Sequence, residues 1–402
     1  MKTVGIVAEY NPFHNGHKHH IAEAKRVSGA DRVAVVMSAS FIQRGEPACA
    51  DKFTRAKWAI DGGADMVIEL PDVFALSCAE RFAGAGVRLL AGTGLVGAIA
   101  FGSESGDLGA LREAACRTFD REAFEKAMGK GLSYPAARSA AQSGELGPND
   151  ILAAEYIRAA QKHCPDAELY AVKRSGSGYL DDGLGGEFSS AKAIRNALKT
   201  CSGETRMTPA VFDGLVRAMP RSVLDEIAEL MKRGAFPATE QELSPAVLYR
   251  FRSMGSEAAA KLPEVSEGLE NLFLSYSAKA CDTDELLGMV KSKRYTMARL
   301  KRTAMCVLLG IDRELQDEAA ASGEALYLRV LAVSGKGSKM LAELNEKARL
   351  PVIVRSSDRE KLPKLASRVE AVSSLAHGIR ALGQPYDKSF VPDLSHRLIV
   401  RE

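Results

Sequence analysis

Short apolar runs alternate with amphipathic stretches through the first half of the chain. The runs lack the strict in–out alternation of a half-exposed strand, and helical patterns separate them. Five such runs predict β-strands, at residues 4–8, 32–38, 65–70, 96–101 and 168–173. Helices are expected between them, at residues 18–27, 51–61 and 74–90. This pattern predicts an α/β fold with a doubly wound parallel sheet covered by helices on both faces.

The pattern changes near residue 200. We expect the sheet domain to span residues 1–200, with a helical insertion at about residues 108–162. Residues 211–235 and 244–280 have helical patterns and little strand signal, and residues 327–333 and 350–354 predict two short strands. Residues 201–402 are therefore predicted as a mainly helical C-terminal region with a small α/β tail.

Composition narrows the class of protein without identifying a function. The 402 residues are 46% hydrophobic and 26% charged, which is typical of a globular protein. No apolar run approaches the ~20 residues of a membrane helix, and the first residues lack the apolar core of a signal peptide. We therefore expect a cytoplasmic protein without a membrane partner. The seven cysteines are scattered without a CxxC pair, which predicts reduced thiols and no zinc site.

The first candidate site lies between the first strand and the first helix. His14, Gly16 and His17 form the pattern H-x-G-H at a position where α/β proteins bind nucleotide phosphates on a helix N-terminus. Imidazole donors there would stabilise the charge on a five-coordinate α-phosphorus, and Gly16 would let the backbone approach the phosphates. We interpret His14 and His17 as catalytic residues for nucleotidyl transfer. Two incidental histidines in a polar loop are the alternative.

A second candidate site follows the fifth strand and a glycine-rich loop at residues 176–186. Ser189 and Ser190 precede a helical pattern, so they predict an N-cap and an anion site. Arg195 lies inside that helix, within reach of a β- or γ-phosphate. A capped helix with a surface arginine is the alternative. Together with the histidines, Ser190 and Arg195 predict two walls of a phosphate cradle.

These two motifs carry a resemblance to a known superfamily. H-x-G-H at residues 14–17 and S-S-A-x-x-I-R at residues 189–195 resemble the signatures of the HIGH-type nucleotidyltransferases, with Ala191 in place of the commoner threonine. Longer runs resemble the bacterial tRNA(Met) cytidine acetate ligase family. They are V-A-E-Y-N-P-F-H-N-G-H at 7–17, F-I-Q-R-G-E-P-A at 41–48, G-A-D-M-V-I-E-L-P at 63–71, F-G-S-E at 101–104, P-N-D-I-L at 148–152, K-R with G-Y at 173–179 and K-R-Y-T at 293–296. Residues 38–40 read S-A-S, where a Ser-Gly-Asn-like stretch is expected.

The resemblance implies a two-step reaction with acetate, ATP and elongator tRNA(Met). The family activates acetate as acetyl-adenylate, releasing pyrophosphate. It then acetylates N4 of the wobble cytidine (position 34), releasing AMP. No obligate protein partner is implied, and without a carboxylate cluster of metal-ligand spacing, magnesium would arrive with the ATP phosphates.

The resemblance also implies an ATP site by position. With the cradle residues, its members are Val7, Ala8, Glu9, Tyr10, Asn11, Pro12, Phe13, His14, Asn15, Gly16, His17, Lys18, His19, His20, Gly102, Asn149, Arg174, Ser190 and Arg195. Gly102 and Arg174 follow strands whose carboxyl ends meet at one sheet edge, where ligands bind. A turn glycine at position 102 and a helix cap at Asn149 remain open alternatives.

A group of basic residues predicts the RNA contact. This basic segment, residues 291–302, lies in a stretch that has no acidic residue between positions 286 and 311. Its candidate RNA-binding residues are Lys291, Lys293, Arg294, Tyr295, Arg299, Lys301 and Arg302. At helical spacing they would fan over the face opposite an apolar stripe, with Tyr295 stacking on a base. A solvated basic helix face is the alternative.

Two other functions share parts of this pattern. A small-molecule nucleotidyltransferase, adenylylating a mononucleotide or phosphopantetheine, would use the same ATP cradle. The second half of the chain, with its basic segment, exceeds what a small acceptor requires. A non-enzymatic RNA-binding protein with a degenerate nucleotide domain is the other alternative. The presence of His14, Gly16, His17 and Arg195 argues against it.

Overall fold

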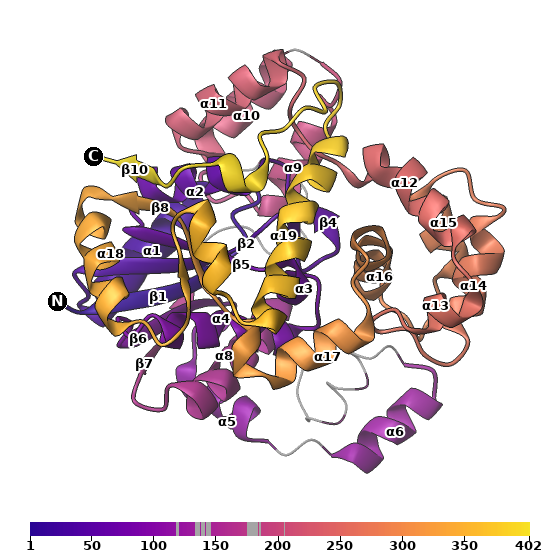
Figure 1. Cartoon of the computed structure of the whole chain (residues 1–402), viewed down its shortest axis with the longest axis horizontal. Coiled ribbons are helices and arrows are strands. Elements are labelled where there is room, and N and C mark those ends of the chain that lie inside the picture. Colours follow the sequence, from indigo (N-terminus) through magenta and orange to yellow (C-terminus); the bar gives the residue numbers. More distant parts are fainter. Residues whose placement is uncertain are drawn as a thin grey trace.

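A single sheet organises the chain, in the order β10-β8-β5-β2-β1-β6-β7, with β9 paired to β8 (Figure 1). The computed structural model describes residues 1–117, 120–132, 137, 141, 146–174, 184, 186–204 and 206–402. The strands are β1 (Thr3–Ala8), β2 (Arg32–Ser38), β5 (Met66–Leu70), β6 (Ala98–Ser103), β7 (Glu168–Lys173), β8 (Leu328–Ser334), β9 (Val352–Ile353) and β10 (Ile399–Arg401). A separate two-stranded hairpin joins β3 (Phe41–Ile42) to β4 (Glu46–Pro47).

The five strands predicted from the apolar runs are all present and pair in parallel. Every residue of β2 and β5 is buried, which explains why these runs show no alternation. β6 begins two residues later than predicted and ends at Ser103, so Gly102 lies inside the strand. The α/β fold class with a mainly parallel, doubly wound sheet is confirmed.

Alternate residues of the strands pack into two separate cores. Val33 and Val35 join the core under α1 (Asn15–Ser28) and α2 (Lys52–Asp61). Ala34 and Val36 join the core under α4 (Ala79–Gly92) and α8 (Pro148–His163). The two helix layers therefore cover opposite faces of the sheet.

The helix predicted at residues 74–90 is divided in two. α3 (Asp72–Ala75) is followed by a break, and α4 begins at Ala79. At the break, Ser77 Oγ donates a hydrogen bond to the carbonyl oxygen of Phe74 at 2.6 Å. Serine offers the backbone this alternative to helical bonding, which propensity along the sequence does not reveal.

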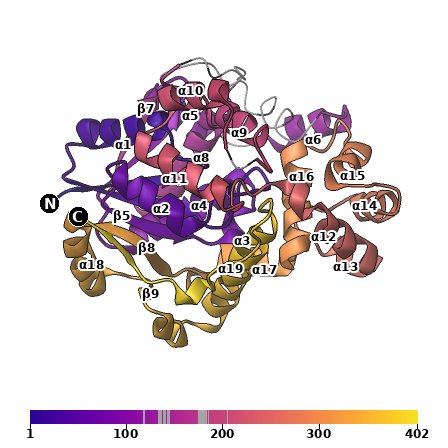
Figure 2. The same cartoon turned by 90° about the horizontal axis from the view of Figure 1, so that it is seen from above.

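The remaining helices follow the predicted helical regions. They are α5 (Leu108–Cys116), α6 (Arg121–Gly129), α9 (Ala191–Lys199), α10 (Pro209–Ala218), α11 (Arg221–Lys232), α12 (Glu240–Ser253), α13 (Ser256–Ala260), α14 (Leu269–Ser277), α15 (Thr283–Val290), α16 (Met297–Leu309), α17 (Arg313–Ala321), α18 (Gly335–Lys347) and α19 (Lys364–Leu382). Figure 2 shows α12 to α16 grouped at one end of the molecule. One member of this group, α16, also contacts two elements outside it, β4 and α19.

The sheet takes strands from both sides of residue 200. β8 pairs antiparallel with β5, and β10 pairs parallel with β8, so the strands near the C-terminus extend the sheet begun by β1 and β2. They therefore do not form a sheet of their own. The division into domains at residues 1–200 and 201–402 stays a prediction.

Buried charges tie the last strands and turns to the sheet. Lys52 on α2 pairs with Glu69 of β5 and with Asp393 Oδ1, the latter at 2.9 Å. Arg329 of β8 also binds Asp393, with 2.7 Å between Nη1 and Oδ2, and Tyr327 donates to Glu69 at 3.0 Å. Because these side chains are almost fully buried, removing one partner would leave an uncompensated charge in the core.

The described part of the chain contains no helix with the length and apolar composition required to span a bilayer.

Candidate functional site

The loop from Glu9 to His14 connects β1 to α1 and is held rigidly. Tyr10 adopts a left-handed backbone with φ of 47°, and the Asn11–Pro12 peptide bond is cis. Asn11 Oδ1 accepts from the backbone N–H of Cys49 at 2.8 Å, and Glu9 Oε1 accepts from the N–H of Gln43 at 2.8 Å. The loop is thus anchored to the segment that follows β2.

Both histidines of the H-x-G-H motif cap the N-terminus of α1. His14 Nδ1 accepts from the N–H of Gly16 at 3.1 Å, and His17 Nδ1 accepts from the N–H of His14 at 3.3 Å. A neutral imidazole that accepts at Nδ1 carries its proton on Nε2. The two rings lie close together, with 3.7 Å between centroids. Each therefore offers an Nε2–H donor beside a helix N-terminus.

The surroundings keep these two histidines uncharged. Burial lowers the pKa of His14 to about 3, and the positive charges of Arg174 and Arg195 act in the same direction. Burial also lowers the pKa of His17 well below its ordinary value, helped by His14 and Arg174. At neutral pH both side chains are neutral hydrogen-bond donors rather than cations.

Gly16 has a steric role within the motif. A Cβ at this position would lie 2.8 Å from His14 Cε1 and 3.0 Å from His14 Nδ1. Any larger residue would push the imidazole away from the helix N-terminus. The glycine is thus required for the position of His14, in addition to the close backbone approach predicted from the sequence.

Two arginines from distant segments join the histidines. Arg174 follows β7, and Arg195 lies on α9, where its Nη1 donates to the carbonyl oxygen of Asn11 at 2.9 Å. Both arginines affect the pKa of His14 and of His17, so the four groups share one site. Ser190 is the N-cap of α9, and its Oγ accepts from the N–H of Ala193 at 3.0 Å. Of the glycine-rich loop at 176–186, residues 176–183 and 185 lie outside the described residues.

Gly102 and Asn149 lie at the same edge of the sheet. Glu104 Oε1 accepts from the backbone N–H of Asn149 at 3.1 Å and from its side-chain amide at 2.5 Å. Asp150 Oδ1 in turn accepts from the N–H of Glu104 at 2.9 Å. The Asn149 amide nitrogen is thus bound to Glu104, and its amide oxygen faces no donor among these contacts. A Cβ at Gly102 would lie 3.8 Å from Arg174 Cγ, so the protein itself does not require glycine there.

The other residues of the predicted ATP set are spread around α1 and β1. Val7 and Ala8 end β1 and are half-buried. Asn15 Nδ2 donates to the carbonyl oxygen of Arg217 at 2.9 Å, and His19 packs against Phe188 with 5.4 Å between ring centroids. Pro12 and Phe13 are buried, Lys18 is exposed, and burial lowers the pKa of His20 to about 4. The structure thus assembles the core of the set and gives Asn15 and His19 contacts within the protein.

Two buried side chains that the sequence did not predict support the site. Arg55 donates to the carbonyl oxygens of Glu9 at 2.7 Å and Ser38 at 3.0 Å, which joins the carboxyl ends of β1 and β2. Asp72 Oδ1 accepts from the N–H groups of Ser40 and Phe41 at 3.0 and 2.8 Å. Burial raises the pKa of Asp72 to about 7. No local spacing marks either residue, because their partners are backbone groups far along the chain.

The basic segment differs from its predicted geometry. Lys291, Lys293, Arg294 and Tyr295 precede α16 instead of lying on it. Acidic residues from elsewhere reach the segment: Arg294 pairs with Glu267 at 3.3 Å and Arg302 with Glu264 at 2.8 Å. The absence of acids within the sequence of the segment therefore does not leave its charges unpaired.

Tyr295 and Arg302 are buried, so the prediction that they lie on an open helix face opposite the apolar stripe is wrong. Tyr295 is 6% exposed, and the Arg299 guanidinium lies 4.9 Å from its ring centroid. α16 packs on nearly all sides because α12, α15, α19 and β4 surround it. In this conformation the Tyr295 ring is not available to stack on a base. Lys291, Lys293 and Arg294 are exposed.

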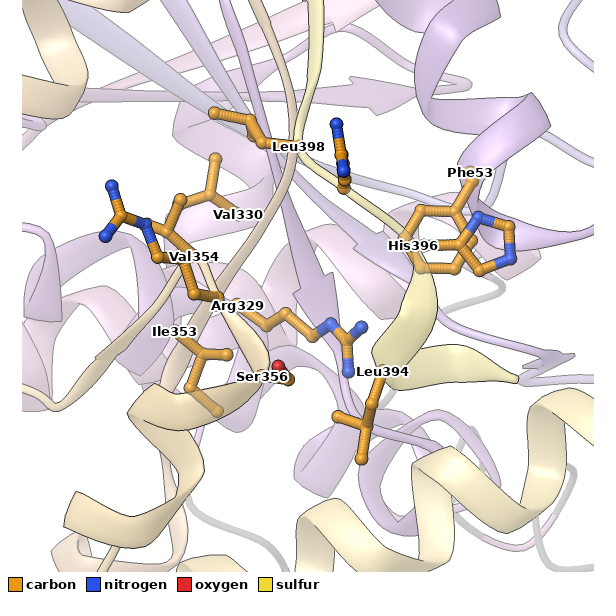
Figure 3. A pocket seen from close by; sticks show the side chains of 11 residues that line it. Phe53, Arg329, Val330, Ile353, Val354, Ser356, Leu394, His396 and Leu398 are labelled. Atoms are coloured by element: carbon orange, nitrogen blue, oxygen red, sulfur yellow. The ribbon is translucent and has the colours of Figure 1, made fainter. Parts of the chain in front are cut away.

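A small pocket lies away from these residues, beside β8 and the C-terminal segment (Figure 3). Phe53 and His396 stack in it with 3.8 Å between ring centroids. Arg329 also lines it, with its guanidinium committed to Asp393. None of the predicted site residues lines this pocket, so it is separate from the candidate site. Across the described residues, no three His, Cys, Asp or Glu side chains are grouped to hold a metal ion.

Comparison with known proteins places the chain in a family. The HIGH Nucleotidyl Transferase family matches residues 1–384. A tRNA(Met) cytidine acetate ligase of Acetivibrio thermocellus is 35% identical over 374 residues, which cover 89% of this chain and 89% of the relative. The chain belongs to the tRNA(Met) cytidine acetate ligase family. A second member, from Caldanaerobacter subterraneus, is 36% identical over 370 residues, covering 88% of this chain and 89% of the relative.

Solved structures agree over the full length. Thermotoga maritima TmcAL bound with alpha-thio ATP matches this structure with a TM-score of 0.88 at 30% identity, covering 100% of both chains. The same protein in its apo form matches with a TM-score of 0.90 at 30% identity, again over 100% of both chains. The fold predicted for a HIGH-type nucleotidyltransferase is thereby confirmed.

Proposed function

We propose that this chain is an ATP-dependent ligase that forms N4-acetylcytidine at the wobble position of elongator tRNA(Met). The observation that carries the proposal is the neutral histidine pair, with two Nε2–H donors at the N-terminus of α1. Membership of the tRNA(Met) cytidine acetate ligase family supports the choice of substrates. A related structure bound to an ATP analogue supports the choice of nucleotide.

In the first step, a carboxylate oxygen of acetate attacks the α-phosphorus of ATP. The new bond forms acetyl-adenylate, and the bond to the β-phosphate oxygen breaks to release pyrophosphate. Negative charge builds on the α-phosphate oxygens in the transition state. His14 and His17 donate to these oxygens from fixed positions, which lowers the barrier by electrostatic stabilisation.

The two arginines bind the rest of the triphosphate in this proposal. The positive charges of Arg174 and Arg195 both act on His14 and His17, lowering the pKa of each imidazole. Guanidinium groups suit phosphate oxygens because they offer several N–H donors in one plane. In this proposal Gly102, near the end of β6, and Asn149, at the start of α8, contact the nucleoside. Magnesium, where present, would enter on the ATP phosphates.

In the second step, the N4 amine of the cytidine attacks the carbonyl carbon of acetyl-adenylate. The amide bond forms, AMP leaves, and the amine gives up one proton to solvent. Aminolysis of an activated ester depends mainly on positioning, so we assign no general base. We expect the reaction in the cytoplasm, with the exposed residues Lys291, Lys293 and Arg294 contacting the tRNA backbone.

The test is incubation of the full chain with ATP, labelled acetate and unmodified elongator tRNA(Met), followed by mass spectrometry of the nucleosides. Label in N4-acetylcytidine is the expected result. Pyrophosphate release only with a small-molecule acceptor would favour the mononucleotide or phosphopantetheine alternative. A chain that binds tRNA but neither releases pyrophosphate nor transfers label would contradict enzymatic function.

A further inference from the structure

An ion-pair chain leads from the ATP site into the C-terminal helices. Glu46 Oε2 lies 3.6 Å from Arg195 Nε, and Glu46 Oε1 lies 2.9 Å from Lys301 Nζ. Lys301 Nζ also lies 3.3 Å from Glu240 Oε1, which Lys199 Nζ approaches at 2.9 Å. The five side chains come from α9, β4, α16 and α12. They link a predicted phosphate ligand to a residue of the basic segment.

The central members of this chain are shielded from solvent. The side chains of Arg195 and Glu240 are each 13% exposed, that of Glu46 is 15% exposed and that of Lys301 is 20% exposed. Shielded pairs are weakened much less by salt than surface pairs. The charges therefore interact strongly with one another. We expect the loss of one charge to change how its neighbours pair.

The backbone fixes Glu46 against α16. Gly45 has a left-handed backbone with φ of 77°, and a Cβ there would lie 2.3 Å from the backbone nitrogen of Arg302. Arg302 Nη1 donates to the carbonyl oxygen of Gln43 at 3.3 Å. The hairpin that carries Glu46 is thus in direct contact with the helix that carries Lys301.

The charges along the ion-pair chain do not cancel. Arg195, Lys301 and Lys199 are cations, whereas Glu46 and Glu240 are anions, so the group carries one net positive charge. Lys301 binds Glu46 more closely than Arg195 does, at 2.9 Å against 3.6 Å. Among the ion pairs described for Glu46, the one with Arg195 would remain without Lys301, and the two charges would neutralise each other.

We propose that Lys301 is a positioning residue for ATP: it holds Glu46 so that the Arg195 charge stays available to the triphosphate. This inference rests on the proposed function, because it takes Arg195 to be a phosphate ligand. It assigns Lys301 to the nucleotide side of the reaction instead of to an RNA contact. Glu46 then sets the direction of the Arg195 side chain, which Asn11 also binds through its carbonyl oxygen.

The proposal predicts that a second substitution restores the nucleotide affinity that the first one loses. Lys301→Met should weaken ATP binding roughly tenfold, because Glu46 then competes with phosphate for Arg195. Glu46→Gln combined with Lys301→Met should bring the affinity back near that of the wild type, because the competing charge is gone. Lys301→Arg keeps the charge and should also retain the affinity.

The experiment is calorimetric titration of the full-length variants with adenosine 5′-(α,β-methylene)triphosphate, with thermal unfolding measured in parallel. Lys57→Met is a matched control, because Lys57 forms a 2.9 Å ion pair with Glu226, and neither residue belongs to the candidate site or to the ion-pair chain. It should leave the nucleotide affinity unchanged. A double variant as weak as Lys301→Met, or a Lys301→Met protein with normal affinity, would overturn the inference.

The titration separates this inference from the proposed function. It requires neither acetate nor tRNA. A wild-type chain that binds the nucleotide but makes no acetylcytidine would overturn only the proposed function. The nucleotide affinities of the variants would then still test the role of Lys301. A wild-type chain that binds no nucleotide would overturn both.

Discussion

The histidine loop, residues 9–17, and the basic segment, residues 291–302, control their charges in opposite ways. In the loop, burial keeps His14 and His17 neutral, and their capping contacts come from within the same helical turn. In the basic segment, acidic partners from distant parts of the chain pair with the cations Arg302 and Lys301. Arg302 finds Glu264 at a separation of 38 residues, and Lys301 finds Glu46 at a separation of 255 residues.

This difference shows which contacts a sequence motif can predict and which it cannot. The hydrogen bonds that cap α1 join residues only two or three positions apart, so the motif alone predicts them. A charged surface depends on every other segment that folds against it. Substitutions in the two regions should therefore affect different properties of the protein.

The largest expected effect is on catalysis in the loop. His17→Ala should lower the rate of acetylcytidine formation by about 10²–10³-fold, the usual range for one lost transition-state donor. The measurement is single-turnover transfer of labelled acetate to tRNA. His163→Ala, at the end of α8 and outside the site, is the control and should retain the rate. A His17→Ala protein with normal turnover would remove the catalytic assignment.

The next effect is on stability in the basic segment. Arg302→Met should lower the free energy of unfolding by about 2 kcal/mol, because it leaves the Glu264 carboxylate unpaired beside α16. Urea unfolding measures this change. The salt dependence of tRNA binding should stay as in the wild type, since Arg302 is buried. A stable variant with a reduced salt slope would mean that Arg302 contacts RNA after all.

Titratable groups in or beside the two regions should also change the stability of the protein in different ranges of pH. The folded-state pKa values of His14, at about 3, and His20, at about 4, lie below the ordinary 6.5, so the unfolded chain binds more protons as pH falls below 6.5. Each such histidine should then lower stability by about 1.4 kcal/mol per pH unit until its folded pKa is reached.

Glu240 in the ion-pair chain behaves differently. Burial raises its pKa, but Lys199 and Lys301 outweigh this and lower it to about 2. Its stabilising contribution should persist above pH 4.5 and be lost only as pH falls toward 2. Denaturant titrations from pH 8 to 3 on the wild type, Glu240→Gln and His20→Gln would separate the two ranges. If the free energy of unfolding changed equally with pH in all three proteins between pH 6 and 5, the result would contradict this account.

The smallest effect belongs to the exposed part of the basic segment. Lys293→Met should weaken tRNA binding a few-fold and reduce the slope of log affinity against log salt by roughly one. Filter binding over a series of salt concentrations measures both. Lys261→Met, an exposed lysine paired with Glu257, serves as the comparison and should leave the slope unchanged. Equal effects of the two variants would mean that Lys293 has no special role.

The sequence predicts the parts of the fold that depend on neighbours. Apolar runs located the five parallel strands, and H-x-G-H located the turn into α1. It did not predict β8 as the antiparallel partner of β5, because strand pairing across more than 200 residues leaves no local pattern. The break at Ser77 depended on one side-chain hydrogen bond to the backbone, which competes with helix propensity.

The candidate site divides in the same way. The predicted His14, His17, Arg174 and Arg195 come together, although their roles in catalysis and binding stay predictions. Glu104, Arg55 and Asp72 support them through bonds to distant backbone groups, which spacing does not show. Tyr295 was interpreted from its basic neighbours in the sequence, whereas its hydroxyl donates to the carbonyl oxygen of Ser266, 29 residues away.

The antiparallel strand β8 has a consequence for synthesis of the chain. A ribosome completes every residue of β1, β2 and β5 long before it reaches Leu328, so the nascent sheet has an open edge at β5. At that stage Lys52 and Glu69 also lack Arg329 and Asp393, their later partners. The growing chain therefore has an unpaired edge strand and lacks part of its buried ion-pair network. We expect it to depend on chaperones that shield such edges until the last strands are made.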